Sequence, residues 1–226
     1  ERIDGQGLTV YPGFIDALSY AGLDQKANRS HTGAGRAIDY TSFAMAATPP
    51  DNRNGLTPEF VATEALALDD AAAGGFREAG FTALVAAPEG GIATGQSALV
   101  STSGLPRREI VLEAPVALHV NLIVPTGGRT YPSTLMGCVA HLRQAMIDAQ
   151  QYDESWRFFE EHGGRRPPLD PTLAALRAAQ RRELPVFWQA DTRDEIDRAL
   201  DLAEEFGVRP VIVGGREAWR STDRLL

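Results

Sequence analysis

The chain has 226 residues, of which 43% are hydrophobic and 23% charged, so it has enough apolar material for one globular domain and is not a disordered or fibrous chain. Its formal net charge of -8 and its lack of a basic run argue against a nucleic-acid partner. The single Cys138 excludes an internal disulfide framework, and no stretch approaches the roughly 18 to 20 uninterrupted apolar residues of a membrane span.

The first part of the chain alternates between strand-like and helix-like patterns. Residues 8–16 predict a strand, and residues 23–56, rich in Gly, Asn, Asp and Pro, predict a long loop. Thr57 is a capping residue followed by proline, which predicts a helix that ends near Gly80. Residues 81–88 follow at once as a short apolar strand. Helix followed directly by strand is the order that a parallel sheet requires.

The middle of the chain interrupts this alternation. Residues 90–125 read as short strands and turns, which predicts a β-rich excursion from the parallel sheet. A helix is predicted from Tyr131, and residues 152–168 are predicted to be irregular and charged. The apolar positions that share one face of this helix are Leu135, Val139, Leu142 and Met146. That face is predicted to be buried, and Cys138 on the same helix is predicted to be a small buried residue.

The last third returns to alternating elements. Asp170 is predicted to cap a helix whose Leu173 and Leu176 face inward, and residues 184–191 predict the next strand. Successive side chains of this strand point to opposite faces of the sheet.

A capping box opens the following helix. Thr192 with Glu195 three residues later marks its start, and Gly207 marks its end. The positions predicted to face inward are Ile196, Ala199, Leu200, Ala203 and Phe206. Residues 208–215 predict one more apolar strand and residues 216–226 another helix.

These elements predict an α/β fold: a partial or degenerate TIM-barrel-like parallel sheet with flanking helices and a β-rich excursion. About four strands read as parallel, whereas a complete eight-stranded barrel takes about 250 residues. We expect a single domain over 1–226, because no linker-like stretch divides the alternation.

The stretch "VYPGFIDALSYAG", residues 10–22, carries a family resemblance. It resembles the first barrel strand of the metal-dependent amidohydrolase superfamily, whose usual pattern is V-x-P-G-F-I-D-x-H-x-H-x-G. Residues 1–10 resemble the lead-in from that family's small β-sandwich. Three later blocks look like the imidazolonepropionase-like branch: "GFTALVAAPEGGIATGQSALV", "STLMGCVAHLRQAMIDAQQY" and "LPVFWQADTRDEIDRALDLAEEFGVRPVIVGGREAW".

The resemblance implies one or two divalent metals, such as zinc, that activate a water for attack on an amide or imine carbon. In the family, the H-x-H pair and later His and Asp residues hold the metals. Here Leu18 and Tyr20 stand at the two histidine positions, and Gln189 stands where the later block often carries a histidine. Leucine has no lone pair, and a neutral phenol is a poor zinc ligand at neutral pH. Asp16 is retained, but one carboxylate does not make a metal site.

No other set of residues replaces the missing ligands. His31, His119, His141 and His162 are far apart and form no metal-binding spacing, so structural roles are expected for them. The Gly-rich "GGIATGQS" lacks the ending of a P-loop, and Ser19, Ser97 and Ser101 lie in no G-x-S-x-G elbow. We therefore assign no catalytic residue, metal ligand or cofactor.

Three functions remain open at this point. The first, which the lost ligand positions favour, is a catalytically inactive amidohydrolase-like module that acts as a structural or interaction subunit of a larger protein assembly. The second is part of a metal-dependent amidohydrolase acting on amide or cyclic amide or imine bonds, with its remaining ligands outside this segment. The third is a small-molecule binder whose barrel mouth is lined by Tyr20, Trp188 and Gln189.

A partial barrel predicts a partner. Its open parallel edges and inner apolar faces need cover, either from further chain or from a second protein. The compartment is not determined by these patterns, although the resemblance slightly favours a periplasmic over a cytoplasmic location.

Overall fold

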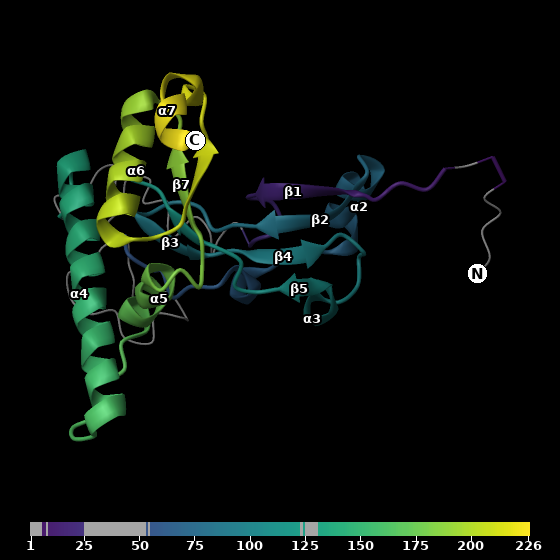
Figure 1. Ribbon diagram of the computed structural model, residues 1–226. Coiled ribbons are helices and arrows are strands. Elements are labelled where there is room, and N and C mark those ends of the chain that lie inside the picture. Colours follow the sequence, from purple (N-terminus) through teal and green to yellow (C-terminus); the bar gives the residue numbers. More distant parts are fainter. Residues whose placement is uncertain (1–5, 8, 25–52, 54, 123, 125–130) are drawn as a thin grey trace.

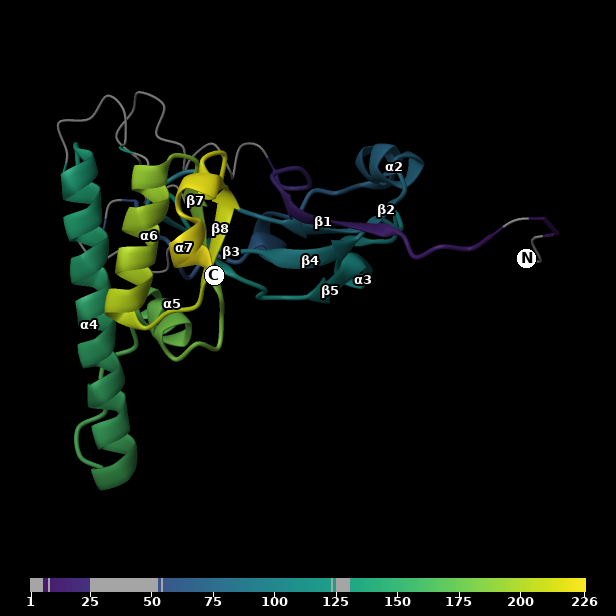
Figure 2. The same cartoon turned by 45° about the horizontal axis from the view of Figure 1, so that its top comes forward.

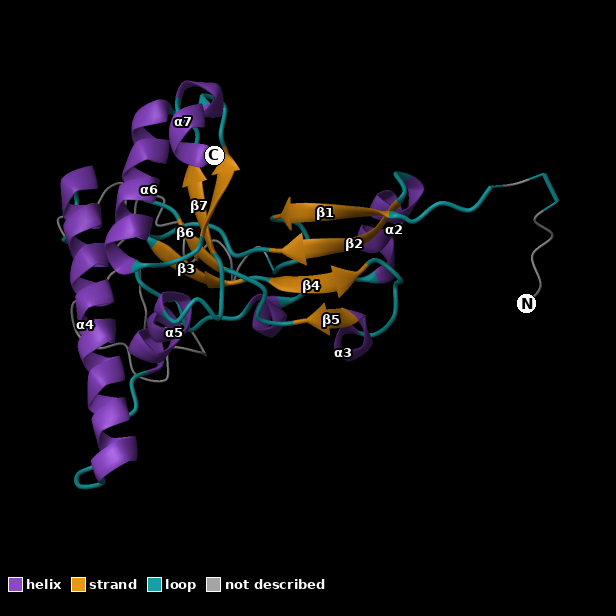
Figure 3. Ribbon diagram, viewed as in Figure 1, coloured by secondary structure: helices purple, strands orange, loops and turns teal. Residues whose placement is uncertain are grey.

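The computed structural model describes residues 6–7, 9–24, 53, 55–122, 124 and 131–226. The strands of these residues form two four-stranded sheets (Figure 3). The first sheet has the spatial order β1 (Phe14–Ser19), β2 (Phe81–Ala86), β4 (Ala98–Ser101), β5 (Val111–Glu113). The second has the order β3 (Ala93–Gln96), β6 (Leu118–Val120), β7 (Val186–Ala190), β8 (Pro210–Gly214).

Parallel pairing is confined to part of each sheet. Strand β1 pairs parallel with β2, and β6, β7 and β8 pair parallel in that order. Strands β3, β4 and β5 pair antiparallel, and they come from the predicted excursion at 90–125. The predicted mixed α/β fold with a partial parallel sheet and a β-rich excursion is therefore confirmed. Because β4 occupies the edge of β2, the excursion divides the parallel strands between two sheets.

The helices cover these sheets unequally. The described helices are α2 (Asp70–Glu78), α3 (Arg107–Ile110), α4 (Leu135–His162), α5 (Pro171–Gln180), α6 (Arg193–Phe206) and α7 (Thr222–Leu225), with short 3-10 turns at Ala62–Ala65 and Ala218–Arg220. Helices α4, α5 and α6 lie together on one side of the second sheet in both views (Figures 1 and 2). None of the described helices is both long and apolar enough to cross a membrane.

Two hydrophobic cores result. The larger lies between the second sheet and helices α4 to α6 and includes Leu142, Leu176 and Trp188. The smaller lies under the first sheet and includes Leu84 and Val100. Burying one fully enclosed leucine side chain contributes about 1.5 to 3 kcal/mol, so these two cores hold the fold together.

Strand β7 shows how the second sheet uses its two faces. Val186, Trp188 and Ala190 are buried towards the helices, whereas Phe187 and Gln189 are half-buried on the opposite face. This alternation follows from the strand period of two. It leaves Gln189 on the face that a closed barrel would enclose.

Helix α4 is longer than predicted. It starts at Leu135 rather than Tyr131, because the Thr134 side chain accepts a hydrogen bond from the Gly137 amide at 3.1 Å. It runs to His162, so the prediction of irregular structure was wrong for residues 152–162. Their charges have helical spacing and no glycine or proline interrupts them before Gly163, whose φ is 72°. The predicted burial of Leu142, Met146 and Cys138 is confirmed, while Leu135 is exposed.

The helix predicted from Thr57 was also wrong over its first half. Helix α2 begins only after Asp69, whose side chain accepts a hydrogen bond from the Ala72 amide at 2.8 Å. Residues 56–61 instead run beside β3, where the Gln96 amide donates to the Phe60 carbonyl at 2.7 Å. Pairing with a strand outweighs the helix propensity here. Residues 216–226 form only two short turns rather than one helix.

The local signals of the last third are confirmed. Asp170 caps α5, whose Leu173 and Leu176 are buried, and Gly207 ends α6 with a φ of 66°. Along α6 the predicted burial is confirmed for Ile196, Ala199, Ala203 and Phe206. Leu202 is buried as well, whereas Leu200, predicted to face inward, is only half-buried. The loop predicted at 23–56 lies largely outside the described residues, and so does His31.

The capping box of α6 supports a direct test. The Thr192 side chain accepts from the Glu195 amide, and Glu195 accepts from the Thr192 amide at 3.0 Å. Replacing Thr192→Ala removes one of these acceptors and is expected to lower the free energy of unfolding by about 1 kcal/mol in urea titrations. Thr192→Ser keeps the hydroxyl and should retain most of the stability, so equal losses in both variants would contradict a capping role.

Candidate functional site

The ends of the parallel strands meet around one small cavity. It is lined by Tyr20 after β1, Glu89 after β2, His119 and Asn121 at β6, and Gln189 of β7. We call these five residues the mouth cluster. The carboxyl ends of barrel strands are where enzymes of TIM-barrel architecture place their active sites. The cavity volume is about 10 Å³, which is close to the space that one water molecule needs.

Tyr20 and Gln189 are joined directly. The Tyr20 hydroxyl donates to Oε1 of Gln189 at 3.2 Å, across 169 positions of sequence. Partial burial, followed by the nearby Glu89 carboxylate, raises the pKa of Tyr20 above its ordinary value. The phenol therefore keeps its proton at neutral pH. Two neutral groups that hydrogen-bond to one another occupy this side of the mouth.

His119 is the buried titratable group of the mouth cluster. Its side chain is 6% exposed, and its ring centroid lies 5.2 Å from that of Phe187. Burial lowers the pKa of His119 to about 4, so the imidazole is neutral at pH 7. Its Nε2 has no hydrogen-bond partner among the described residues. A structural role was predicted for this histidine; it is the middle residue of β6, and its ring lines the mouth.

Asp16 and Leu18 lie further back on β1. The Asp16 carboxylate accepts a hydrogen bond from the Leu18 amide at 3.2 Å, and both side chains are half-buried. The Asp16 carboxylate therefore forms a hydrogen bond with the backbone of its own strand. Within the described part of the chain, no group of three or more His, Cys, Asp or Glu side chains has the arrangement of a metal site.

Trp188 lies on the other side of the sheet from the mouth. It is 3% exposed in the helix-facing core, and it borders a hollow of about 300 Å³ that Asn121 and Gln189 of the mouth cluster also line. The structure thus brings Tyr20 and Gln189 together, whereas Trp188, which was predicted to line the mouth with them, lies in the helix-facing core, because neighbouring residues of a strand point to opposite faces.

Gly214 at the end of β8 also shapes the mouth. Its φ is 89°, and a Cβ there would lie 2.4 Å from Oδ1 of Asp191 and 3.1 Å from Nε2 of Gln189. A side chain at this position would require the Asp191 carboxylate to move and would crowd the Gln189 amide. The end of β8 contributes backbone only, and the "VGG" of the sequence is typical of such a close approach.

Comparison with solved structures finds a protein of similar fold. The chain matches the crystal structure of an amidohydrolase from Thermotoga maritima with a TM-score of 0.73 and 25% sequence identity. The match covers 95% of this chain and 54% of that one. The chain has an amidohydrolase-like fold. No family model and no curated protein sequence matches it.

The structural match covers unequal shares of the two chains. The chain spans about half the length of the Thermotoga amidohydrolase, and nearly all of it takes part in the match. The predicted resemblance to the amidohydrolase superfamily is thus supported at the level of fold. Assignment to the imidazolonepropionase-like branch and the loss of the H-x-H motif stay predictions.

Proposed function

We propose that this chain is a catalytically inactive amidohydrolase-like module that serves as a structural or interaction subunit of a larger protein assembly. The observation that carries the proposal is the hydrogen bond between Tyr20 and Gln189 at 3.2 Å. Both stand at positions where the family resemblance places imidazole ligands. The Tyr20 hydroxyl donates its proton to Gln189, so the phenol is in its neutral form, a poor metal ligand, and the Gln189 oxygen accepts from a side chain of this chain.

The chemistry of the remaining mouth residues supports inactivity. Zinc in hydrolases is held by imidazole, thiolate or carboxylate groups. Leu18 offers no lone pair, the Tyr20 phenol is protonated, and Gly214 has no room for a side chain. Among the described residues of the mouth, His119 provides an imidazole and Glu89 a carboxylate, and two such groups fall short of the three or four protein ligands of a zinc site.

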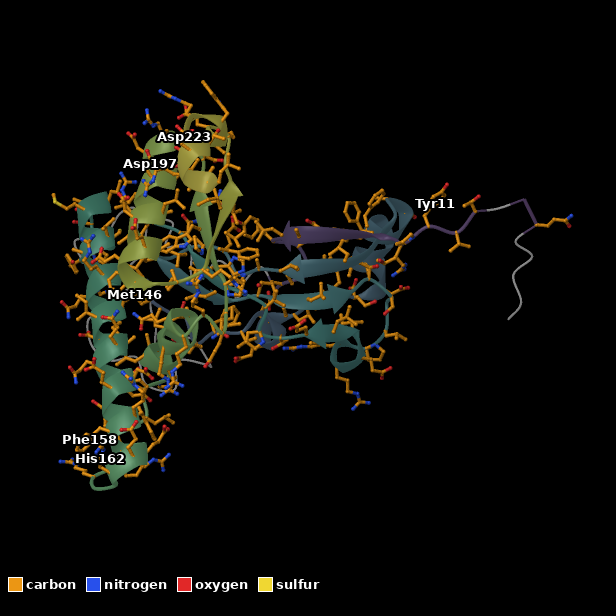
Figure 4. The ribbon with its side chains drawn as sticks, viewed as in Figure 1. Tyr11, Met146, Phe158, His162, Asp197 and Asp223 are labelled. Carbon is orange, nitrogen blue, oxygen red and sulfur yellow. The ribbon has the colours of Figure 1, made fainter. Side chains whose placement is uncertain are left out.

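The interaction role rests on the open edges of the two sheets. Among the described residues, β1 pairs only with β2 and β8 pairs only with β7. Phe14 and Ile15 of β1 are 67% and 61% exposed, and Figure 4 shows Tyr11 on the segment that leads away from this strand. Unpaired strand edges with apolar side chains are sites where another strand adds to a sheet. The partner we propose is a protein that supplies such strands.

Metal content tests the inactive role. We expect the purified chain, after exposure to zinc and gel filtration, to carry far less than one metal ion per chain by elemental analysis. The matched variant is Leu18→His, Tyr20→His and Gln189→His combined, which restores imidazoles at the three positions where the family resemblance places them and should gain zinc. Stoichiometric zinc in the unaltered chain that is lost in His119→Phe would overturn the proposal.

A second candidate follows from the length of the match. Because the chain spans about half of the Thermotoga amidohydrolase, it can form part of a metal-dependent amidohydrolase acting on amide or cyclic amide or imine bonds, with its ligands elsewhere. The two functions predict different effects of a substitution at Tyr20, the residue that follows β1. In such an enzyme Tyr20→Phe should lower kcat, whereas in an inactive module it should change stability only.

A further inference from the structure

The segment that joins α4 to α5 contains two adjacent prolines. Residues 163–170 belong to no helix or strand, and Figure 2 shows the chain turning back here from the end of α4. Proline fixes its own φ at about -65° and restricts the residue before it to extended conformations. Arg166, Pro167 and Asp170 each precede a proline, and Asp170 has the extended φ of -127° and ψ of 103°. The sequence "RRPPLDP" of residues 165–171 therefore favours a polyproline II conformation.

Burial along this segment repeats with the period of that conformation. Pro167 and Asp170 are half-buried, whereas the residues directly before and after each of them are exposed. A polyproline II helix has about three residues per turn, so residues three apart lie along one edge of it. The edge with Pro167 and Asp170 lies against the protein, and the other two edges face solvent.

Interactions with the neighbouring elements hold the segment in place. Asp170 accepts a hydrogen bond from the Leu173 amide of α5 at 3.1 Å, and its carboxylate lies 2.9 Å from Nη1 of Arg53. The Arg166 guanidinium lies 5.3 Å from the centre of the Trp156 ring of α4. A segment that is already ordered loses little conformational entropy on binding, so more of the contact energy contributes to affinity.

The solvent-facing edges carry side chains that another protein can bind. Arg165, Pro168 and Pro171 follow one edge at a spacing of about 9 Å, and Leu169, which is 75% exposed, lies on the other. Glu154 of α4 and Arg165 line one hollow, yet none of the described carboxylates forms an ion pair with Arg165. The Arg165 guanidinium is therefore available to a carboxylate of another molecule.

We propose that residues 165–171 are a docking segment for a protein domain that has an aromatic-lined groove with a carboxylate at one end. Such grooves bind polyproline II segments by packing against their proline rings and neighbouring apolar side chains. Here Pro168 and Leu169 supply the apolar contacts, and the carboxylate pairs with Arg165. The segment is separate from the strand edges of the proposed function, so either proposal can fail without the other.

Titration followed by NMR tests the docking. The whole chain is added to isotope-labelled SH3 and WW domains, which are classes of domain that bind polyproline II segments in aromatic-lined grooves. We expect the groove resonances of at least one domain to shift, and we expect Pro168→Ala to weaken that binding about 10-fold or more. No shift in any of these domains, or equal binding by the Pro168→Ala chain, would overturn the proposal.

A pair of charge substitutions separates the segment from general electrostatic attraction. Arg165→Glu should weaken the binding about 10-fold or more, because it places a carboxylate against that of the groove. The matched control is Arg108→Glu, which changes an exposed arginine of α3, makes the same change in net charge and should leave binding unchanged. Equal losses in the two variants would show that net charge governs the binding and would contradict the proposal.

A synthetic peptide of residues 163–171 tests access to the segment in the folded protein. The peptide should compete with the chain for the same domain. It should bind more weakly, because it lacks the contacts of Asp170 and Arg166 that hold the segment extended. A domain that binds the peptide but not the chain would show that the segment is covered in the folded protein, and the docking role would be wrong.

Discussion

Acidification from pH 6.5 to about 4 is expected to lower the free energy of unfolding by about 3 kcal/mol through His119 alone. Burial lowers the folded-state pKa of this histidine to about 4, whereas in the unfolded chain it titrates near 6.5. Between these values the unfolded state binds one more proton than the folded state, so stability falls as the pH falls. Above pH 6.5 the contribution is complete, and below 4 it is lost.

Urea titrations over this pH range measure the effect, with His119→Phe as the matched variant. Phenylalanine keeps an aromatic ring beside Phe187 and removes the proton-binding site. The difference in stability between the two proteins should change by up to about 1.4 kcal/mol per pH unit within the window. Glu59, whose pKa is raised mainly by burial, remains in both proteins and cancels in the difference. Parallel pH profiles of the two proteins would show that His119 does not titrate as we expect.

Gly95→Ala is expected to lower the free energy of unfolding by about 2 to 4 kcal/mol. Gly95 of β3 has a φ of 125°, and an added Cβ would lie 2.6 Å from the Phe60 carbonyl oxygen and 2.8 Å from Phe60 Cδ1. Relief would require movement of the backbone of residues 56–61, whose pairing holds β3 in place. Both the conformation and the contact therefore oppose a side chain.

The matched control for this substitution is Gly75→Ala. Gly75 lies within α2 with open space around its added Cβ, and its φ is not positive. Alanine there should raise stability by about 0.4 to 1 kcal/mol, because it restricts the unfolded chain and favours the helix. Thermal or urea unfolding measures the free energy of unfolding of both variants, which carry the same added methyl group at a crowded and at an open position. A Gly95→Ala protein as stable as the parent would refute the close approach of Phe60.

Local signals in the sequence predicted local structure well. The box of Thr192 with Glu195, the cap at Asp170 and the left-handed Gly207 all act within a few residues, so their outcome depends little on the rest of the chain. The helix predicted at Thr57 failed for the opposite reason. Its Thr57–Pro58 pattern is typical of a helix start, but the Thr57 hydroxyl donates to the Thr94 carbonyl and residues 56–61 run beside β3, which no local pattern reveals.

The site was predictable only in part. Leu18, Tyr20 and Gln189 were identified from a family pattern, but the contact between Tyr20 and Gln189 joins two sheets and depends on tertiary folding. The opposite orientation of Trp188 was available from the period of the strand. His119 and Gly214 were assigned no role, because a single buried histidine and a glycine pair are common in strands and turns.

The last turns of α4 extend beyond the core and are expected to open locally. The buried residues of this helix end at Tyr152, and the last ten residues contain none that is fully enclosed. They are held by ring packing around Trp156, by the Arg166 guanidinium 5.3 Å from its ring, and by the ion pair of Asp153 with Arg181 at 2.6 Å. Backbone amides after Tyr152 should therefore exchange with deuterium through local opening, well before the amides around Leu142.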